Sequence, residues 1–185
     1  MDDVRGFMET YLDRDRQILA ERLQRISDRV AELGPQIHQQ GGGDGEWSAH
    51  EILAHLAVVS KFYGVLVHRI AAGKLEDLNL LEAVNMRDAA GKQMSELEPA
   101  ELVRMTLADH ERTIKTLRTT STSSLRRSAR ADDGTTMTAQ EVARLPLVTH
   151  LEMHLEQLEK VLGPSGAASP SGTPTPPHEG GGHIA

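Results

Sequence analysis

The clearest structural signal in the sequence is the segment SAHEILAHLAVVSKFYGVLVHRI at residues 48–70. Ser48 is a preferred helix N-cap residue, and Glu51, three positions later, completes a capping box. Apolar residues then recur at helical spacing until Gly73, where we expect the helix to end. The predicted stripe on one face of this helix consists of Ile52, His55, Leu56, Val59, Phe62, Leu66 and Ile70.

Three further segments have helical periodicity, whereas aromatic residues are scarce and long β-branched alternations are absent. A first helix is predicted over about residues 4–33, a third over residues 99–119, and a last one over residues 138–162. Pro146 lies inside the last helix and is expected to kink it or to split off its first two turns. The apolar stripe predicted for the first helix is Phe7, Tyr11, Ile18, Leu19, Leu23, Ile26, Val30 and Leu33.

Four long amphipathic helices predict an all-α fold, a four-helix bundle, over residues 1–163. Residues 74–96 are long enough for a crossover connection that carries a short helix or a set of turns. Residues 120–134 are expected to be a polar connection. The Pro/Gly/Ser-rich segment at residues 164–185 has almost no large apolar side chains, so we predict a disordered C-terminal tail.

Composition narrows the set of partners. The formal net charge of -7 and the pI of about 5.7 argue against nucleic acid. Arg126, Arg127 and Arg130 are interpreted as a solvated loop, although they are also candidates for contact with an anionic cofactor. The sequence begins without the basic and apolar regions of a secretory signal, and no apolar run approaches membrane-spanning length. We therefore expect a cytoplasmic protein with neither nucleic acid nor membrane as a partner.

The chain contains no cysteine. This excludes disulfides, thiolate zinc ligands and a cysteine nucleophile. Any thiol chemistry must therefore use a thiol supplied by another molecule.

Three histidines are candidate metal ligands. His150 and His154 are four residues apart in a predicted helix, so both side chains lie on one face, one turn apart. His55 belongs to a different predicted helix, on the side that carries its apolar residues. Three imidazoles that converge from two helices make a natural site for a divalent metal ion.

Each part of this set also has an ordinary structural interpretation. The pair His150 and His154 taken alone is more typical of partly exposed helical histidines, and a single inward His55 is more typical of a satisfied core residue. The three together favour a metal, because a bundle interior is a poor place for three unpaired imidazoles.

The other six histidines are predicted to lie outside the site. His50 and His55 are five residues apart and point about 140° apart, so they cannot bind one ion as a zincin pair does, and His50 is expected at the surface. His68 is about 20 Å from His55 along the helix. His110 is expected on a polar helix surface, with a fourth metal ligand as the alternative. His38 falls in a loop, and His178 and His183 fall in the predicted tail.

The sequence resembles the DinB/YfiT-like superfamily of metal-binding four-helix-bundle proteins. The segment WSAHEILAHL at residues 47–56 is similar to that family's second helix, with a Trp-Ser start and an inward His-Leu. The segment THLEMHLEQL at residues 149–158 is similar to its last-helix pattern H-x-x-x-H-x-x-Q. The linking residues 77–79 and 84–85 add a less specific likeness. The resemblance covers about residues 1–163.

The resemblance implies that His55, His150 and His154 bind one divalent ion, commonly zinc or nickel, and that the protein is a homodimer. It also implies a small-molecule substrate and a low-molecular-weight thiol such as bacillithiol or mycothiol, because family members include S-transferases and isomerases that use these thiols. Glu152, Glu156 and Gln157 are candidates for polar contacts around the site, with Glu152 expected to face away from the ion. The family name comes from DNA-damage induction, which does not establish DNA binding.

We therefore predict a metal-dependent, thiol-using S-transferase, in which three protein ligands leave coordination positions open. Two alternatives remain at this stage. The chain is either a non-catalytic metal-binding or dimerising bundle, which a closed fourth ligand such as His110 would favour, or a metal-dependent hydrolase, which needs a general base beside the ion.

Overall fold

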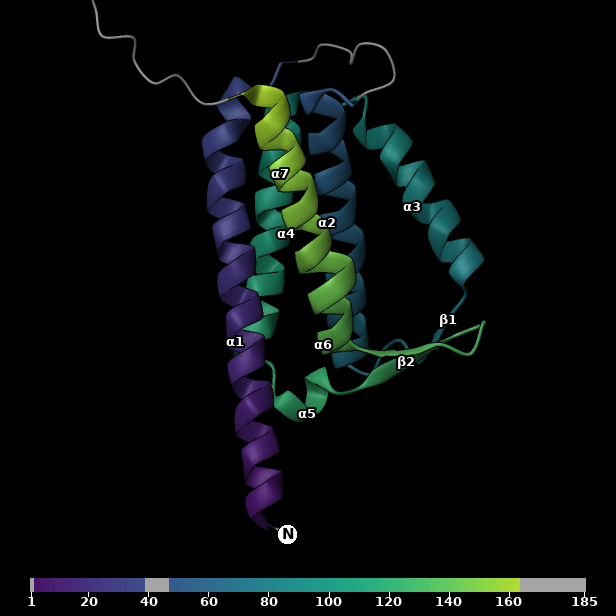
Figure 1. Cartoon of the computed structure of the whole chain (residues 1–185). Coiled ribbons are helices and arrows are strands. Elements are labelled where there is room, and N and C mark those ends of the chain that lie inside the picture. Colours follow the sequence, from purple (N-terminus) through teal and green to yellow (C-terminus); the bar gives the residue numbers. More distant parts are fainter. Residues whose placement is uncertain (1, 39–46, 164–185) are drawn as a thin grey trace, which may run out of the picture.

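Four long helices pack side by side along most of the molecule, in a computed structural model that describes residues 2–38 and 47–163 (Figure 1). This arrangement confirms the predicted helical bundle. The predicted tail at residues 164–185 lies outside the described residues, as does most of the predicted loop before the second helix. The four bundle elements are α1 (Asp2–Leu33), α2 (Ala49–Ala71), α4 (Pro99–Thr119) and a last helix made of α6 (Ala139–Val142), a π-helical segment (Ala143–Thr149) and α7 (His150–Leu162).

The capping box predicted at the start of α2 is present. The Ser48 hydroxyl accepts a hydrogen bond from the Glu51 backbone N–H at 3.2 Å, and the Glu51 carboxylate accepts one from the Ser48 N–H at 2.8 Å. The helix that follows is the most deeply buried in the bundle, and Ile52, Leu53 and Leu56 are fully buried. The cap thus determines where α2 begins, and the apolar faces of α2 determine its position in the core.

The predicted apolar stripe of α1 is confirmed in its second half and wrong in its first. Leu19, Leu23 and Val30 are buried in the core. Phe7 and Tyr11, by contrast, are 69% and 54% exposed. The reason is that α1 extends past the ends of its neighbours, so its first turns have no helix beside them (Figure 1).

The connections contain more regular structure than the sequence predicted. The crossover between α2 and α4 forms β1 (Asp77–Leu78) and α3 (Leu80–Met94), which lies against α2 outside the bundle (Figure 1). The supposed polar connection after α4 forms α5 (Thr122–Leu125) and β2 (Ser128–Ala131), which are followed by β3 (Thr136–Thr138).

These strands make a small sheet in the order β1-β2-β3. Strand β1 pairs in parallel with β2, placing Asp77 opposite Arg130, and β2 pairs antiparallel with β3. Strands of two to four residues are too short to give a recognisable alternation, so sequence periodicity missed them. The sheet lies beside α2.

Pro146 is accommodated without breaking the last helix. Proline has no N–H for the regular helical hydrogen bond, and the chain responds by widening into the π-helical segment before α7 begins. The predicted local disturbance is therefore present as a wider turn. This turn sets the rotation with which α7 presents His150 and His154 to α2.

On length and composition alone α2 is apolar enough to cross a membrane, contrary to the expectation that no segment approached that length. Its most apolar window is 56% buried inside the bundle. The apolar character of α2 therefore matches its place as the central helix of the core.

Candidate metal centre

Three imidazoles converge between α2 and α7. His55 on α2 and His150 and His154 on α7 each offer a nitrogen, and these three atoms lie within 4.8 Å of one another. The His55 Nε2 and His150 Nε2 atoms are 3.2 Å apart. Two nitrogens bound to one tetrahedral zinc ion at about 2.0–2.1 Å lie about 3.3 Å from each other. The spacing of the rings therefore fits one divalent ion between them.

Burial keeps these rings in the form that binds metals. The pKa of His55 is lowered to about 4, mostly by desolvation and to a smaller extent by the neighbouring His154 and His150 rings. Burial is also the largest cause that lowers the pKa of His150. Both rings are thus neutral at pH 7, and a neutral imidazole has the free lone pair that a metal ligand needs.

Hydrogen bonds to the ring nitrogens orient two of the candidate ligands. The Gln157 side-chain oxygen lies 3.0 Å from His154 Nδ1, and the Pro146 carbonyl bonds to the His150 ring. With its proton on Nδ1, His154 presents Nε2 to the cluster. Of the other two candidates for polar contacts, Glu152 faces away as predicted and accepts a bond from Arg22 Nε at 2.8 Å, and Glu156 is exposed.

Replacing Gln157 by alanine should lower the affinity for zinc by about 10- to 100-fold, the usual cost of losing such an outer hydrogen bond. The change removes the acceptor that fixes the His154 ring. Competition with a zinc-binding dye measures the affinity, and Glu156→Ala, exposed on the same helix, is the matched control. Equal zinc affinity in both variants would show that Gln157 does not orient the ligand.

Trp47, Tyr63 of α2 and Arg87 of α3 complete the site, and the sequence analysis did not identify them as residues of the site. The Trp47 ring stacks on His154 with centroids 5.7 Å apart and meets the edge of His55 at 5.0 Å. Tyr63 lies 6.4 Å from His150 between ring centroids and bonds to Arg87 of α3. Arg87 lies near the site because α3 packs along α2. The spacing of residues in the sequence did not predict this packing.

Two predictions about the remaining histidines are wrong. His50 is 6% exposed, and its Nε2 donates to the Leu97 carbonyl at 2.8 Å. His110 is 1% exposed, and its Nε2 lies 2.8 Å from the Ser60 hydroxyl. Within the described ranges the metal-ligand cluster contains three side chains and not His110. His68 is exposed on α2.

The buried His110 makes stability depend on pH. Burial lowers its pKa to about 4, against 6.5 for the free side chain. The unfolded chain therefore takes up the proton first, and the stabilisation present above pH 6.5 is lost as the pH falls from there toward about 4. Between pH 7 and pH 5 this group should remove about 2 kcal/mol from the free energy of unfolding.

Urea unfolding at the two pH values measures this effect in the wild type and in His110→Gln. The variant should lose about 2 kcal/mol less than the wild type over the same interval. The exposed His68→Gln serves as the control and should behave like the wild type. If His110→Gln kept the full pH dependence, another group would be responsible.

Comparisons with known proteins give a family and a fold. The sequence model of the DinB superfamily matches residues 11–158. Two solved structures of mycothiol-dependent maleylpyruvate isomerase, one of them a histidine-to-alanine mutant, are similar, with TM-scores of 0.60 and 0.61 at 18% identity. The alignment covers 79% of this chain and 60% of that protein, so the chain spans less than two thirds of the isomerase's length. No curated protein matches the sequence.

Proposed function

The chain belongs to the DinB superfamily, and from this membership and the three converging imidazoles we propose that it is a metal-dependent enzyme acting with a low-molecular-weight thiol. More specifically, we propose an S-transferase that joins a thiol such as mycothiol or bacillithiol to an electrophile. The observation that carries the proposal is the cluster of His55, His150 and His154. The proposal includes zinc or nickel as the ion, a homodimer as the assembly and the cytoplasm as the location.

The donor set supports a resident divalent ion held by the three histidines. All three ligands are imidazoles, a type that suits zinc and nickel, and the nitrogen spacing of 3.2 Å is the one that a shared ion requires. When bound, the ion would supply Lewis acidity that lowers the pKa of a thiol close to neutral pH. Three protein ligands leave room for that thiol, as catalytic sites do and closed structural sites do not.

The surrounding residues have separate tasks. Trp47 covers the His154 and His55 rings and limits the access of water. Gln157 holds the His154 ring in place. Arg87 and Tyr63 place a positive charge and a hydroxyl beside His150. Together these side chains flank the three imidazoles.

The reaction itself is a displacement. The thiol gives up its proton to solvent, its sulfur forms the new bond to the electrophilic carbon, and the leaving group departs with the electron pair of the broken bond. Because the chain has no cysteine, the sulfur belongs to the small-molecule thiol throughout.

Thiol-dependent isomerisation is the second candidate, because the fold is similar to that of a mycothiol-dependent maleylpyruvate isomerase. The two activities differ in the fate of the thiol. A transferase consumes one thiol for each product, whereas an isomerase regenerates it.

The test uses the zinc-loaded protein with mycothiol or bacillithiol and the chromogenic electrophile 1-chloro-2,4-dinitrobenzene. We expect thioether to form with matching loss of free thiol, to stop on chelation and to resume when zinc is restored. Turnover that is indifferent to chelation would reject the metal-dependent mechanism. Isomerisation of an added cis-alkene without loss of thiol would select the second candidate.

A further inference from the structure

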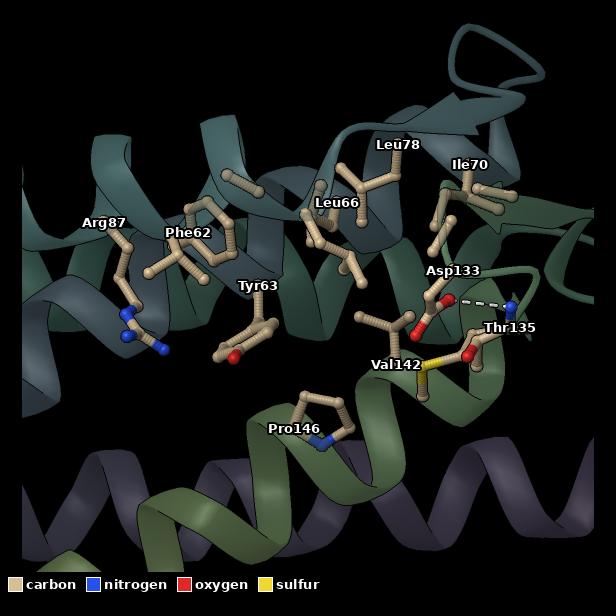
Figure 2. A pocket seen from close by; sticks show the side chains of 16 residues that line it. Phe62, Tyr63, Leu66, Ile70, Leu78, Arg87, Asp133, Thr135, Val142 and Pro146 are labelled. Carbon is tan, nitrogen blue, oxygen red and sulfur yellow. Dashed lines mark hydrogen bonds between the residues drawn. The ribbon is translucent and has the colours of Figure 1, made fainter.

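An apolar pocket lies beside the candidate metal centre, enclosed by α2, α3, the small sheet and the π-helical segment (Figure 2). Its volume is about 260 Å³. Hydrocarbon makes up most of its wall. The side chains that contribute most of this wall include Phe62, Leu66, Ile70, Ala83, Met137 and Val142.

The end of the pocket near the metal centre carries a positive charge. Arg87 lines the pocket there and bonds to Tyr63. Its bonding partner Tyr63 lies 6.4 Å from the candidate ligand His150, measured between ring centroids, which places the Arg87 charge beside the candidate metal centre. Its ion-pair partner Asp88 is 63% exposed, and an exposed pair of this kind is weak and easily exchanged. Arg87 is therefore available to an anion that enters the pocket.

The opposite end carries a negative charge. Asp133 lies at the turn between β2 and β3, and its carboxylate accepts a hydrogen bond from the Thr135 N–H at 2.8 Å. This bond keeps the pKa of Asp133 below its usual range, so the side chain is ionised. Figure 2 shows Arg87 and Asp133 at opposite ends, with apolar side chains between them. The pocket is thus electrically polarised along its length.

We propose that this pocket binds the electrophilic co-substrate, and that this molecule has an apolar body and a single anionic group, which Arg87 holds beside the metal centre. The volume equals that of about nine water molecules in the liquid, at about 30 Å³ each, so the pocket accepts a short hydrocarbon chain and not a large ligand. A second anionic group at the far end would lie close to the ionised, exposed carboxylate of Asp133, and the two like charges repel each other. The pocket therefore selects monoanions over dicarboxylates of the same length.

The pocket's role in catalysis rests on the proposed function, but binding can be measured without turnover. Isothermal titration calorimetry of the zinc-loaded protein with octanoate tests it, with octanedioate and the uncharged 1-octanol as probes of equal chain length. We expect octanoate to bind at least about tenfold more tightly than either, a difference of about 1.4 kcal/mol. Equal affinity for octanoate and octanedioate would overturn the proposed selectivity.

Matched variants locate the binding site. Arg87→Met should weaken octanoate binding by at least about tenfold, whereas Arg104→Met, at an exposed arginine of α4, should leave it unchanged. Ala83→Leu fills the pocket and should abolish binding, whereas Ala89→Leu, exposed on the same helix, should not. Unchanged affinity in both Arg87→Met and Ala83→Leu would place octanoate elsewhere.

The same titration with metal-free His154→Ala separates this proposal from the proposed function. Retained octanoate binding supports the pocket and its Arg87 anchor independently of any ion. Loss of binding in that variant would mean that the carboxylate binds the metal, and the assignment to Arg87 would be wrong. If the zinc-loaded wild-type protein bound octanoate but showed no thiol-transfer activity, the proposed function would be contradicted and the pocket assignment would remain intact.

Discussion

Replacement of His154 by alanine is expected to lower kcat/KM for thiol transfer by about a thousandfold or more. Lewis-acid activation contributes several kcal/mol to such reactions, and about 4 kcal/mol corresponds to a factor of about 10³. His154 supplies one of the three ligand nitrogens that lie within 4.8 Å of one another, so the alanine variant keeps only two candidate ligands. Steady-state rates with mycothiol and a chromogenic electrophile measure the effect, and His55→Ala and His150→Ala should behave alike.

The matched control for this prediction is His68→Ala. His68 lies on α2 like His55, but it is exposed and does not belong to the cluster. Its replacement should leave kcat/KM within about twofold of the wild type, as is usual for surface substitutions. A His154→Ala enzyme as active as His68→Ala would remove the histidine cluster from the mechanism.

Replacement of Leu151 by alanine should lower the free energy of unfolding by about 3–5 kcal/mol. Leu151 is fully buried and lies on α7 between the two candidate ligands of that helix. The cost combines lost hydrophobic burial with the cavity that remains. Urea denaturation followed by circular dichroism measures it.

Met153→Ala is the control for Leu151→Ala because Met153 lies on the same helix and is 60% exposed. It should change stability by no more than about 0.5 kcal/mol. A similarly small loss in Leu151→Ala would show that α7 is held in the bundle by other contacts.

The helical bundle was predictable from local signals. The capping boxes at Ser48 and Thr138 report the starts of two helices directly, because the residues that form them are neighbours in sequence. The features that the sequence did not predict depend on contacts between segments that are distant in the sequence. The exposed Phe7 follows from the reach of α1 beyond its neighbours, and β1 follows from its pairing with β2, about fifty positions later in the sequence.

The same division holds for the candidate site. The i,i+4 spacing of His150 and His154 and the inward position of His55, together with the resemblance to a known family, led to the prediction that the three meet, and the structure brings them together. The burial of His110 was not predictable, because it depends on how α4 packs against Ser60 of α2. The position of Arg87 depends likewise on the path of α3, which the sequence did not define.

Metal content tests the central claim most directly. The wild-type chain and His68→Ala are loaded with zinc, freed of excess ion by gel filtration and analysed by plasma mass spectrometry beside His55→Ala, His150→Ala and His154→Ala. The three converging imidazoles predict one zinc ion per chain in the first two proteins and almost none in the other three. Full zinc retention in His154→Ala would contradict a single ion held between α2 and α7.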